Sequence, residues 1–305
     1  MKPLLLTLPG NAELGERLAQ CTGWECGAVA ARSFPDGETH LRIDADCTGR
    51  SVAVLCALDR PNEKALPLLF AASTVRELGA ARVGVVAPYL AYMRQDRRFQ
   101  AGEAVTSRIF ARLLSQAFDW LVTLDPHLHR FHALGELYSI PTRVAHAAPA
   151  LASWIAAEVA APLLVGPDQE SEQWVAEVAR RIGAPHLVLA KTRRGDRDVE
   201  ISVPDVDHYR DRSPVILDDV VSSARTMIET VRRLRAAGLA DPVCLGIHGI
   251  FAGDTQRALR EAGAARIVTT TSIRHETNAI EIAELLVSPV SELVLGPVTR
   301  PGVES

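Results

Sequence analysis

Residues 215–230 read VILDDVVSSARTMIET, and this stretch decides the fold. An apolar run ends in the acids Asp218 and Asp219, and small hydroxyl residues then open an amphipathic helix. A strand that passes through polar residues into a helix is the repeating unit of α/β proteins. Because free amides at a helix amino terminus favour anions, this junction is suited to a phosphate. The alternative is an acidic strand end followed by an ordinary helix cap.

The same alternation of strand and helix extends outward in both directions from this segment. Apolar runs predict further strands at 4–8, 51–58, 82–90, 120–127, 161–168, 242–250 and 265–273. Helical stretches separate them, such as the long one near 62–79. Continuous runs of Val, Leu and Ile are typical of parallel strands that are covered by helices on both faces. The sequence therefore predicts an α/β protein with mainly parallel, doubly wound sheets.

The Ala/Pro-rich segment HAAPA at 146–150 interrupts this rhythm, which then restarts. A chain of 305 residues has room for about two domains. We expect two similar α/β domains, residues 1–146 and 147–305, with the extreme C-terminus packing back on the first. Ligands bind beyond the carboxyl ends of strands in such folds, so polar strand ends are the first site candidates. Three strands end in this way, with the sequences LDPH, GPDQE and ILDD.

Composition excludes several classes of protein. The chain is 48% hydrophobic with a formal charge of -4, which offers no basic field for nucleic acid or an anionic membrane. Five cysteines without a CxxC pair argue against a metal cluster or disulfide framework and favour the cytoplasm. We expect no signal peptide or membrane span, and the GxxxxGK[ST], GxGxxG, HExxH and GxSxG motifs are absent. Lysine occurs only as Lys2, Lys64 and Lys191, so a site that uses lysine is notable.

Three further polar segments are candidate sites, each with a plainer alternative. FPDGE at 34–38 is either a ligand contact or a Pro-Asp-Gly turn with solvent-facing acids. RQDRRF at 94–99 is either a solvated loop or a set of arginine forks for phosphate oxygens. The charged stretch Thr192–Asp198 lies between two strand-like runs, and we expect a mobile loop there.

Together these segments resemble the ribose-phosphate diphosphokinases, also called phosphoribosyl diphosphate synthetases. Residues 218–226 are similar to the phosphoribosyl diphosphate loop of that family and of type I phosphoribosyltransferases. The segments FPDGE, RQDRRF, LDPHLH at 124–129, GPD at 166–168 and KTR at 191–193 follow the order and spacing of the synthetases. The resemblance spans nearly the whole chain, and the joint match is specific although each motif alone is weak.

The resemblance implies two domains of type I phosphoribosyltransferase-like topology, with the ATP-binding residues in the first. Phe34 is implied to stack on adenine, often from a neighbouring subunit of a homo-oligomer (dimer or hexamer). The residues implied to bind ATP are Phe34, Asp36, Gly37, Glu38, Arg94, Gln95 and Asp96. Lys191 and Arg193 are implied to be catalytic, on a loop that closes over the triphosphate and stabilises developing negative charge.

The second domain is implied to hold the sugar phosphate. The residues implied to bind ribose 5-phosphate are Asp218, Asp219, Ser222, Ser223, Ala224, Arg225 and Thr226. His127 and Asp168 are implied to contact Mg²⁺ and its nucleotide; because imidazole is a weak ligand for this hard ion, His127 acts through water or phosphate. A transition-metal site that also uses His129 and His132 is the alternative, but no thiolate accompanies them.

The implied reaction is transfer of the β,γ-diphosphoryl group of Mg-ATP to the C1 hydroxyl of ribose 5-phosphate. The products are 5-phospho-α-D-ribose 1-diphosphate and AMP, which places the enzyme in nucleotide biosynthesis in the cytoplasm, without nucleic acid or membrane partners. One alternative is a type I phosphoribosyltransferase, against which FPDGE and KTR argue. The other is a catalytically silent homologue with a regulatory or scaffold role, against which the intact Lys191–Arg193 pair argues.

Arg225 departs most from the family pattern, because glycine is usual at its position. Glycine takes a positive φ there and lets the backbone approach phosphate closely, whereas arginine is strained in that conformation. We expect Arg225 to keep a helical conformation and to use its guanidinium on a phosphate or on Glu229. The alternatives are a distorted loop that binds poorly and an Arg225 side chain that simply points to solvent. Two milder departures are the acidic GPDQE segment and the serines Ser222 and Ser223.

Overall fold

The computed structural model describes residues 1–128, 130–194, 198–202 and 206–296. The chain forms two compact units, one from Met1–His146 together with the chain from Ile282 onward, and one from Ala147–Glu281. Each unit contains a sheet covered by helices on both faces, and the predicted α/β class with mainly parallel strands is confirmed.

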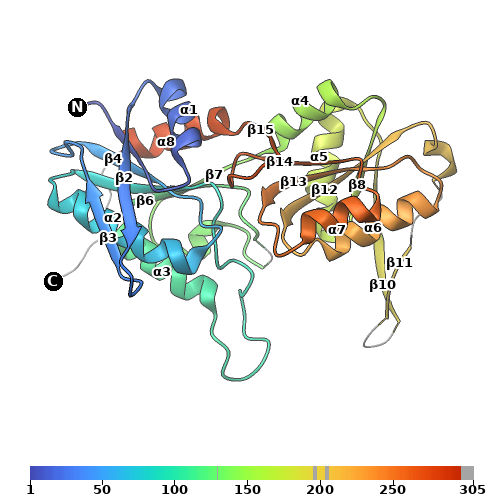
Figure 1. Ribbon diagram of the computed structural model, residues 1–305, viewed down its shortest axis with the longest axis horizontal. Coiled ribbons are helices and arrows are strands. Elements are labelled where there is room, and N and C mark those ends of the chain that lie inside the picture. Colours follow the sequence, from blue (N-terminus) through green and yellow to red (C-terminus); the bar gives the residue numbers. More distant parts are fainter. Residues whose placement is uncertain (129, 195–197, 203–205, 297–305) are drawn as a thin grey trace. The chain divides into compact units, whose positions relative to one another are not determined.

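The first unit is built on a seven-stranded sheet in the order β3-β2-β1-β4-β5-β6-β7. Its strands are β1 (Leu4–Thr7), β2 (Glu25–Ser33), β3 (Thr39–Ile43), β4 (Ser51–Leu55), β5 (Arg82–Ala87), β6 (Trp120–Leu124) and β7 (Thr142–Ala145). Its helices are α1 (Ala12–Thr22), α2 (Pro61–Glu77), α3 (Thr106–Ala117), the 3₁₀ turn η1 (Leu134–Glu136) and α8 (Ala283–Leu295). Helices α1 and α8 pack together on one face of the sheet, and α2 and α3 cover the other (Figure 1).

The second unit is built on a six-stranded parallel sheet in the order β15-β14-β13-β12-β8-β9. Its strands are β8 (Pro162–Gly166), β9 (His186–Val188), β12 (Ser213–Val221), β13 (Val243–Gly249), β14 (Arg266–Thr270) and β15 (Asn278–Ile280). Its helices are α4 (Ala148–Glu158), η2 (Gln169–Ser171), α5 (Glu172–Ile182), η3 (Asp207–Tyr209), α6 (Arg225–Ala236) and α7 (Thr255–Ala262). Helix α4 packs on α5 and α6 packs on α7, so each pair forms one layer.

Burial explains why these strands are continuous apolar runs. All residues of β5, β6 and β13 are buried, as expected for strands that are covered on both faces. Local signals set the helix ends: α2 has Pro61 in its first turn, and α1 ends at Gly23, whose φ is +69°. The strand positions predicted from the sequence agree best with the structure where the strands are central and apolar.

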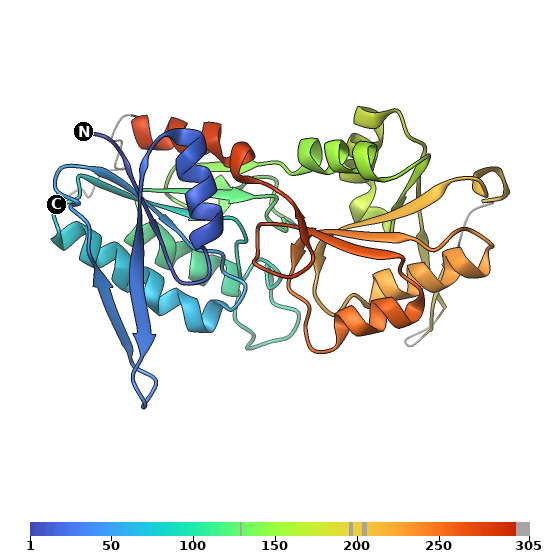
Figure 2. The ribbon, with the colours of Figure 1, turned by 45° about the horizontal axis from the view of Figure 1, so that its top comes forward.

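Two antiparallel hairpins add to this frame. Strands β2 and β3 pair from Val29↔Ile43 to Ser33↔Thr39, and the tip of their hairpin extends beyond the rest of the sheet (Figure 2). Strands β10 (Ala190–Arg194) and β11 (Asp198–Ser202) form a separate two-stranded ribbon. The expectation of a loop over Thr192–Asp198 is therefore wrong for the residues in these strands. The charged residues of this stretch form no apolar run from which a strand would be predicted.

Candidate functional site

Each sheet has one point at which the chain reverses its direction of winding. In the second unit the chain runs from β8 outward to β9 and then returns to β12 on the other side of β8. The adjacent carboxyl ends of β8 and β12 therefore form a topological switch point, where open α/β sheets bind their ligands. Asp168 follows β8, and Asp218 and Asp219 lie in the last part of β12.

The three carboxyl groups at this switch point interact with one another. Burial of Asp218 raises its pKa well above the ordinary value, and the negative charges of Asp219 and Asp168 raise it further. The amide of Asp219 partly offsets this by donating to Asp218 Oδ1 at 3.0 Å. Among the described residues, no cationic side chain contributes to the shift. This arrangement favours a bound cation or a hydroxyl-bearing ligand that donates hydrogen bonds.

The loop from Ser222 to Thr226 joins β12 to α6. Ala224 has φ +49° and ψ 22°, and its carbonyl accepts the hydrogen bond of Ile228 N at 2.8 Å. The amides of residues 225–227 therefore come before the first bond within α6 and are available to an anion. This is the geometry that a phosphate requires.

The positive φ of the loop falls on Ala224, not on Arg225. Arg225 is the first residue of α6 and has helical backbone, as expected from the sequence, and its side chain is exposed. Arginine is thus accommodated without the left-handed conformation that glycine would supply. Glu229 accepts a hydrogen bond from Arg233 Nε at 2.7 Å, so the carboxylate considered as a partner of Arg225 is engaged one turn further on.

The FPDGE segment forms the exposed turn of the β2–β3 hairpin. Phe34 N donates to Glu38 O at 2.7 Å, and Glu38 N donates to Asp36 Oδ1 at 3.2 Å, while Gly37 supplies φ +92°. Phe34 is 39% exposed; the guanidinium of Arg32 lies 4.7 Å from its ring centroid, and the His40 ring makes an edge contact at 5.9 Å. One part of the ring is thus covered by a cation, and a planar ligand would stack on the remainder.

The RQDRRF segment follows β5 and is fixed by a residue that the sequence did not identify. Arg130 Nη1 donates to both carboxylate oxygens of Asp96, at 3.0 and 2.9 Å, and the Asp96 side chain is 2% exposed. The carbonyl of Gln95 accepts from Ser107 N at 3.3 Å, and Arg94 is exposed. Asp96 therefore holds the loop in place, while Arg94 faces outward. The Asp–Arg spacing of 34 residues gives no local signal from which the pair could be predicted.

The LDPH segment follows β6 in the first unit. His127 is half-buried, and His129 lies outside the described residues. Asp125 has φ +31° and accepts a hydrogen bond from His146 Nδ1 at 2.8 Å, which raises the pKa of His146. His132 begins the next segment, where its amide donates to Glu136 Oε1 at 2.8 Å. The ring of His146 thus pairs with Asp125, whereas His132 is held through its backbone amide.

Lys191 and Arg193 lie in β10, where Lys191 pairs in register with Ile201 and Arg193 with Val199. The two residues occupy alternate positions, which share one face of a strand. The ribbon therefore brings the two predicted catalytic residues to the same face.

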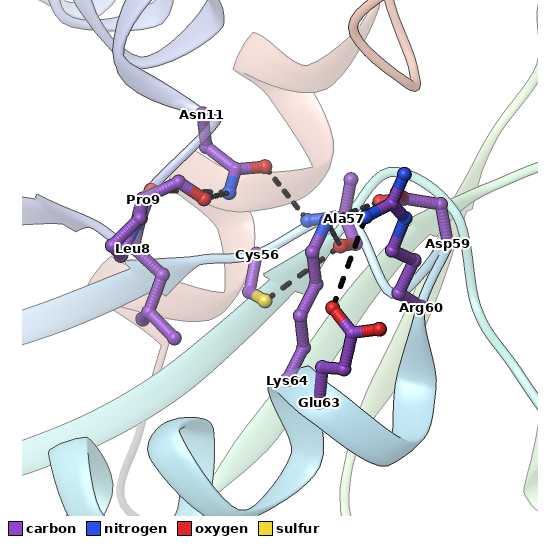
Figure 3. A network of polar contacts seen from close by, with 9 residues as sticks. All are labelled: Leu8, Pro9, Asn11, Cys56, Ala57, Asp59, Arg60, Glu63 and Lys64. Carbon is purple, nitrogen blue, oxygen red and sulfur yellow. Dashed lines mark hydrogen bonds and ion pairs between the residues drawn. The ribbon is translucent and has the colours of Figure 1, made fainter. Parts of the chain in front are cut away.

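The switch point of the first sheet, between β1 and β4, is occupied by a closed polar network (Figure 3). Asn11 is buried and its Oδ1 accepts the amide of Ala57 at 2.8 Å, while its Nδ2 donates to Leu8 O and to Pro9 O, both at 3.1 Å. Lys64 Nζ donates to Ala57 O at 2.9 Å and forms an ion pair with Asp59. Lys64, one of the few lysines, thus has a structural role.

Magnesium fits the donor set of the second unit. Within the part of the chain that the structure describes, no three His, Cys, Asp or Glu side chains form a group that could hold a metal ion. Mg²⁺ does not need such a group, because it keeps several waters and binds through one or two carboxylates and substrate phosphates. Asp218 lies beside the negative charges of Asp219 and Asp168, and a bound Mg²⁺ would neutralise part of that charge. Among the described helices, none has both the length and the apolarity that a membrane crossing requires.

Comparisons with known proteins agree with this geometry. Residues 4–117 match the family model of the N-terminal domain of ribose phosphate pyrophosphokinase, and residues 134–284 match that of the phosphoribosyl transferase domain. The chain is 30% identical to the ribose-phosphate pyrophosphokinase of Methanopyrus kandleri, over 95% of this chain and 98% of that protein. It is 29% identical to that of Saccharolobus solfataricus, over 88% and 93%. The crystal structure of phosphoribosylpyrophosphate synthetase from Mycobacterium smegmatis has the same fold, with a TM-score of 0.82, 24% identity and coverage of 96% and 99%.

Proposed function

The chain belongs to the ribose-phosphate pyrophosphokinase family, and from this premise we propose that it makes 5-phospho-α-D-ribose 1-diphosphate from ATP and ribose 5-phosphate. The C1 hydroxyl oxygen of the sugar attacks the β-phosphorus of ATP. The bond between that phosphorus and the α-phosphate oxygen breaks, AMP leaves, and the hydroxyl proton passes to solvent. This chemistry depends mainly on positioning and charge neutralisation.

The observation that carries the proposal is the β12–α6 junction of the second unit. Asp218 and Asp219 offer carboxylate oxygens to ribose hydroxyls, and the amides of residues 225–227 precede the first bond of α6. Ser222, Ser223 and Thr226 supply hydroxyls beside these amides, and Arg225 adds an exposed guanidinium. A sugar that carries a phosphate matches this set, since its hydroxyls and its anion meet complementary groups.

The residues of the first unit are proposed to bind ATP. The exposed Phe34 ring is suited to stack on adenine, and the acids Asp36 and Glu38 beside Gly37 can accept its exocyclic amine. Arg94 is proposed to contact phosphate oxygens together with Gln95. Asp96 is a positioning residue in this proposal, because its carboxylate is held by Arg130.

The charges that stabilise the transition state are proposed to come from Lys191 and Arg193. Compact ammonium and forked guanidinium groups at alternate positions of β10 suit a triphosphate that gains negative charge as it reacts. Asp168 and the carboxylates near it are proposed to hold hydrated Mg²⁺, and His127 to contact phosphate or bound water. Bound Mg²⁺ would neutralise phosphate charge.

An assay of the purified chain with Mg-ATP and ribose 5-phosphate tests the function. Equal amounts of AMP and phosphoribosyl diphosphate are expected, and neither should form without ribose 5-phosphate. Consumption of phosphoribosyl diphosphate with a nucleobase, without AMP from ATP, would instead identify a phosphoribosyltransferase. A folded protein with neither activity would be a silent homologue.

We also propose that the chain is a homo-oligomer that pairs through the outer face of α2 and α3. Four exposed apolar side chains form this α2–α3 patch: Leu66, Phe70, Ile109 and Leu113. Exposed patches of this kind mark protein interfaces. The exposed acids of α2 are Glu63 and Glu77, and the exposed cations of α3 are Arg108 and Arg112. A two-fold axis would therefore bring the α2 of one copy against the α3 of another with opposite charges facing.

Sedimentation at micromolar concentration tests the pairing. The Phe70→Glu variant should dissociate, whereas Leu295→Glu, at a more exposed apolar position on α8, should sediment as the unmodified chain does. A monomeric unmodified chain with full specific activity would contradict both the oligomer and a nucleotide site shared between subunits.

A further inference from the structure

The turn that follows β13 is bonded to the predicted ribose-phosphate loop at successive backbone positions. The amides of Ile250 and Phe251 both donate to Val221 O, at 3.0 and 2.9 Å, and Ala252 N donates to Ser222 O at 3.1 Å. The Thr255 hydroxyl lies 2.9 Å from Ser222 O and 2.6 Å from Ala252 O, and it shares its hydrogen between them. The residues at which the loop leaves β12 are thus held from a neighbouring strand.

The turn has a strained conformation that only its surroundings can maintain. Phe251 has φ +45°, which is costly for a residue with a bulky side chain. Its ring stacks on His275 at 4.4 Å with 27° between the planes. The ring also passes over Gly249, where a Cβ would lie 2.8 Å from Phe251 Cε2. These contacts keep the turn in the one shape that directs its amides at Val221 and Ser222.

Thr255 contacts the ribose-phosphate loop through its side chain, whereas the other residues of the turn do so through backbone amides. It is the first residue of α7 and is 5% exposed, and its hydroxyl leaves its own helix to reach Ser222. Ser222 is two residues before Ala224, whose positive φ orients the first amides of α6. A shift of the Ser222 carbonyl therefore moves the amides that are suited to a phosphate. A misplacement of about 1 Å can lower a rate by about 10²-fold.

We propose that Thr255 is a positioning residue for ribose 5-phosphate, acting through the backbone of Ser222. This inference rests on the proposed function for its substrate, but not for its geometry. Thr255→Val keeps the branched shape and removes the hydroxyl. It should raise the KM for ribose 5-phosphate about fivefold and leave the KM for ATP within about twofold, while Thr255→Ser should restore the unmodified values.

A matched control separates positioning from a general loss of stability. Thr270 is buried in the same sheet, and its hydroxyl donates to Ile247 O at 2.7 Å and accepts from Ser272 N at 3.2 Å, two bonds that do not involve Ser222. Thr270→Val therefore removes a comparable bond and should leave both KM values near those of the unmodified chain. Equal changes in both KM values, or the same change in Thr270→Val, would overturn the assignment.

Hydrogen exchange of the full chain tests the geometry without turnover. Thr255→Val should speed exchange of the amides over 221–228, and Thr270→Val should not. Unchanged exchange there overturns the proposal whatever the kinetics show; faster exchange without the selective rise in KM leaves Thr255 merely structural and also overturns it. An inactive unmodified chain would refute the proposed function, and the affinity of Thr255→Val and Thr270→Val for ribose 5-phosphate would then replace KM beside the exchange measurement. Thr255→Ala replaces Thr255→Val if the latter does not fold.

Discussion

At the switch point of the first sheet, polar groups satisfy one another, whereas at that of the second sheet carboxyl groups raise the pKa of their neighbour. Asn11 and Lys64 use their hydrogen-bonding groups on the backbone and on Asp59 (Figure 3). Asp218 is crowded by Asp219 and Asp168. The two sites occupy equivalent places in their sheets, at the carboxyl ends of the strands where the winding reverses.

The difference between the two switch points shows that an equivalent position in the fold does not imply an equivalent function. A satisfied network contributes to stability and has little left to offer a ligand. Crowded carboxylates reduce stability, and a cation or a hydroxyl donor can relieve them. The switch point alone therefore does not identify a binding site; the state of its polar groups does.

The largest expected effect is on Lys191. Lys191→Ala should lower turnover by about 10²–10³-fold, the cost of removing one donor to developing negative charge. The free energy of unfolding should not change, since the residue lies in a ribbon outside both large sheets. Steady-state kinetics and urea unfolding measure the two quantities. Near-normal turnover would remove Lys191 from the mechanism.

Lys64 provides the matched control in the first unit. Lys64→Met removes the ammonium from Ala57 O and Asp59 and should lower the free energy of unfolding by about 1–3 kcal/mol, while turnover at saturating substrate stays near normal. The two lysines would then differ in what they support: Lys191 contributes to turnover, and Lys64 contributes to the free energy of unfolding. Equal loss of turnover in both variants would contradict the contrast between the sites.

Asn11→Ala is the next test, directed at the closed network. The variant leaves the buried amide of Ala57 without its acceptor, and we expect a loss of about 1–3 kcal/mol in the free energy of unfolding. Substrate KM values should be unaffected when the protein is folded. Urea unfolding followed by circular dichroism measures the loss. An unchanged midpoint would mean that the network is not structural.

Asp218→Asn tests the crowded site, with the opposite sign. Because the folded state raises the pKa of Asp218, its contribution to stability is fully present below its ordinary value of 3.8 and is lost as the pH rises through the folded pKa. Asparagine does not ionise, so the variant should be more stable than the unmodified chain at about pH 9, and the difference should shrink towards pH 4. One unit of pKa shift corresponds to about 1.4 kcal/mol.

Urea unfolding in the presence of EDTA, which removes divalent cations, measures this difference across the pH range. The same variant should bind ribose 5-phosphate more weakly, since it loses a carboxylate of the proposed site. A variant that is less stable than the unmodified chain at high pH would show that Asp218 is compensated in a way that the crowding does not reveal.

Sequence patterns predicted the parts of the fold that burial dictates. Central strands such as β5 and β6 are largely apolar runs, and acids at the ends of β8 and β12 marked the second switch point. The β10 strand was missed because its charged sequence, AKTRR, contains no such run. The Asp96–Arg130 and Thr255–Ser222 contacts join residues far apart in the chain, so only the fold brings them together. Arg225 was expected to be helical and is, but no sequence signal marked Ala224 as the left-handed residue of the loop.

The smallest expected effect concerns Ala224, the left-handed residue before α6. Gly10 in the turn before α1 has φ +84°, and Ala224 before α6 has φ +49°, so each switch point has a left-handed residue before a helix. Gly10→Ala introduces strain of about 1–2 kcal/mol, although no atom lies within 4 Å of the new Cβ. Ala224→Gly relieves the same strain but gives up about 0.5–1 kcal/mol of chain entropy and about 0.8 kcal/mol for a buried methyl. The terms nearly cancel, so the free energy of unfolding should change by less than about 0.5 kcal/mol. Urea unfolding of the two variants measures both changes. A destabilisation of Ala224→Gly as large as that of Gly10→Ala would mean that Ala224 is not strained, and that the second switch point is as relaxed as the first.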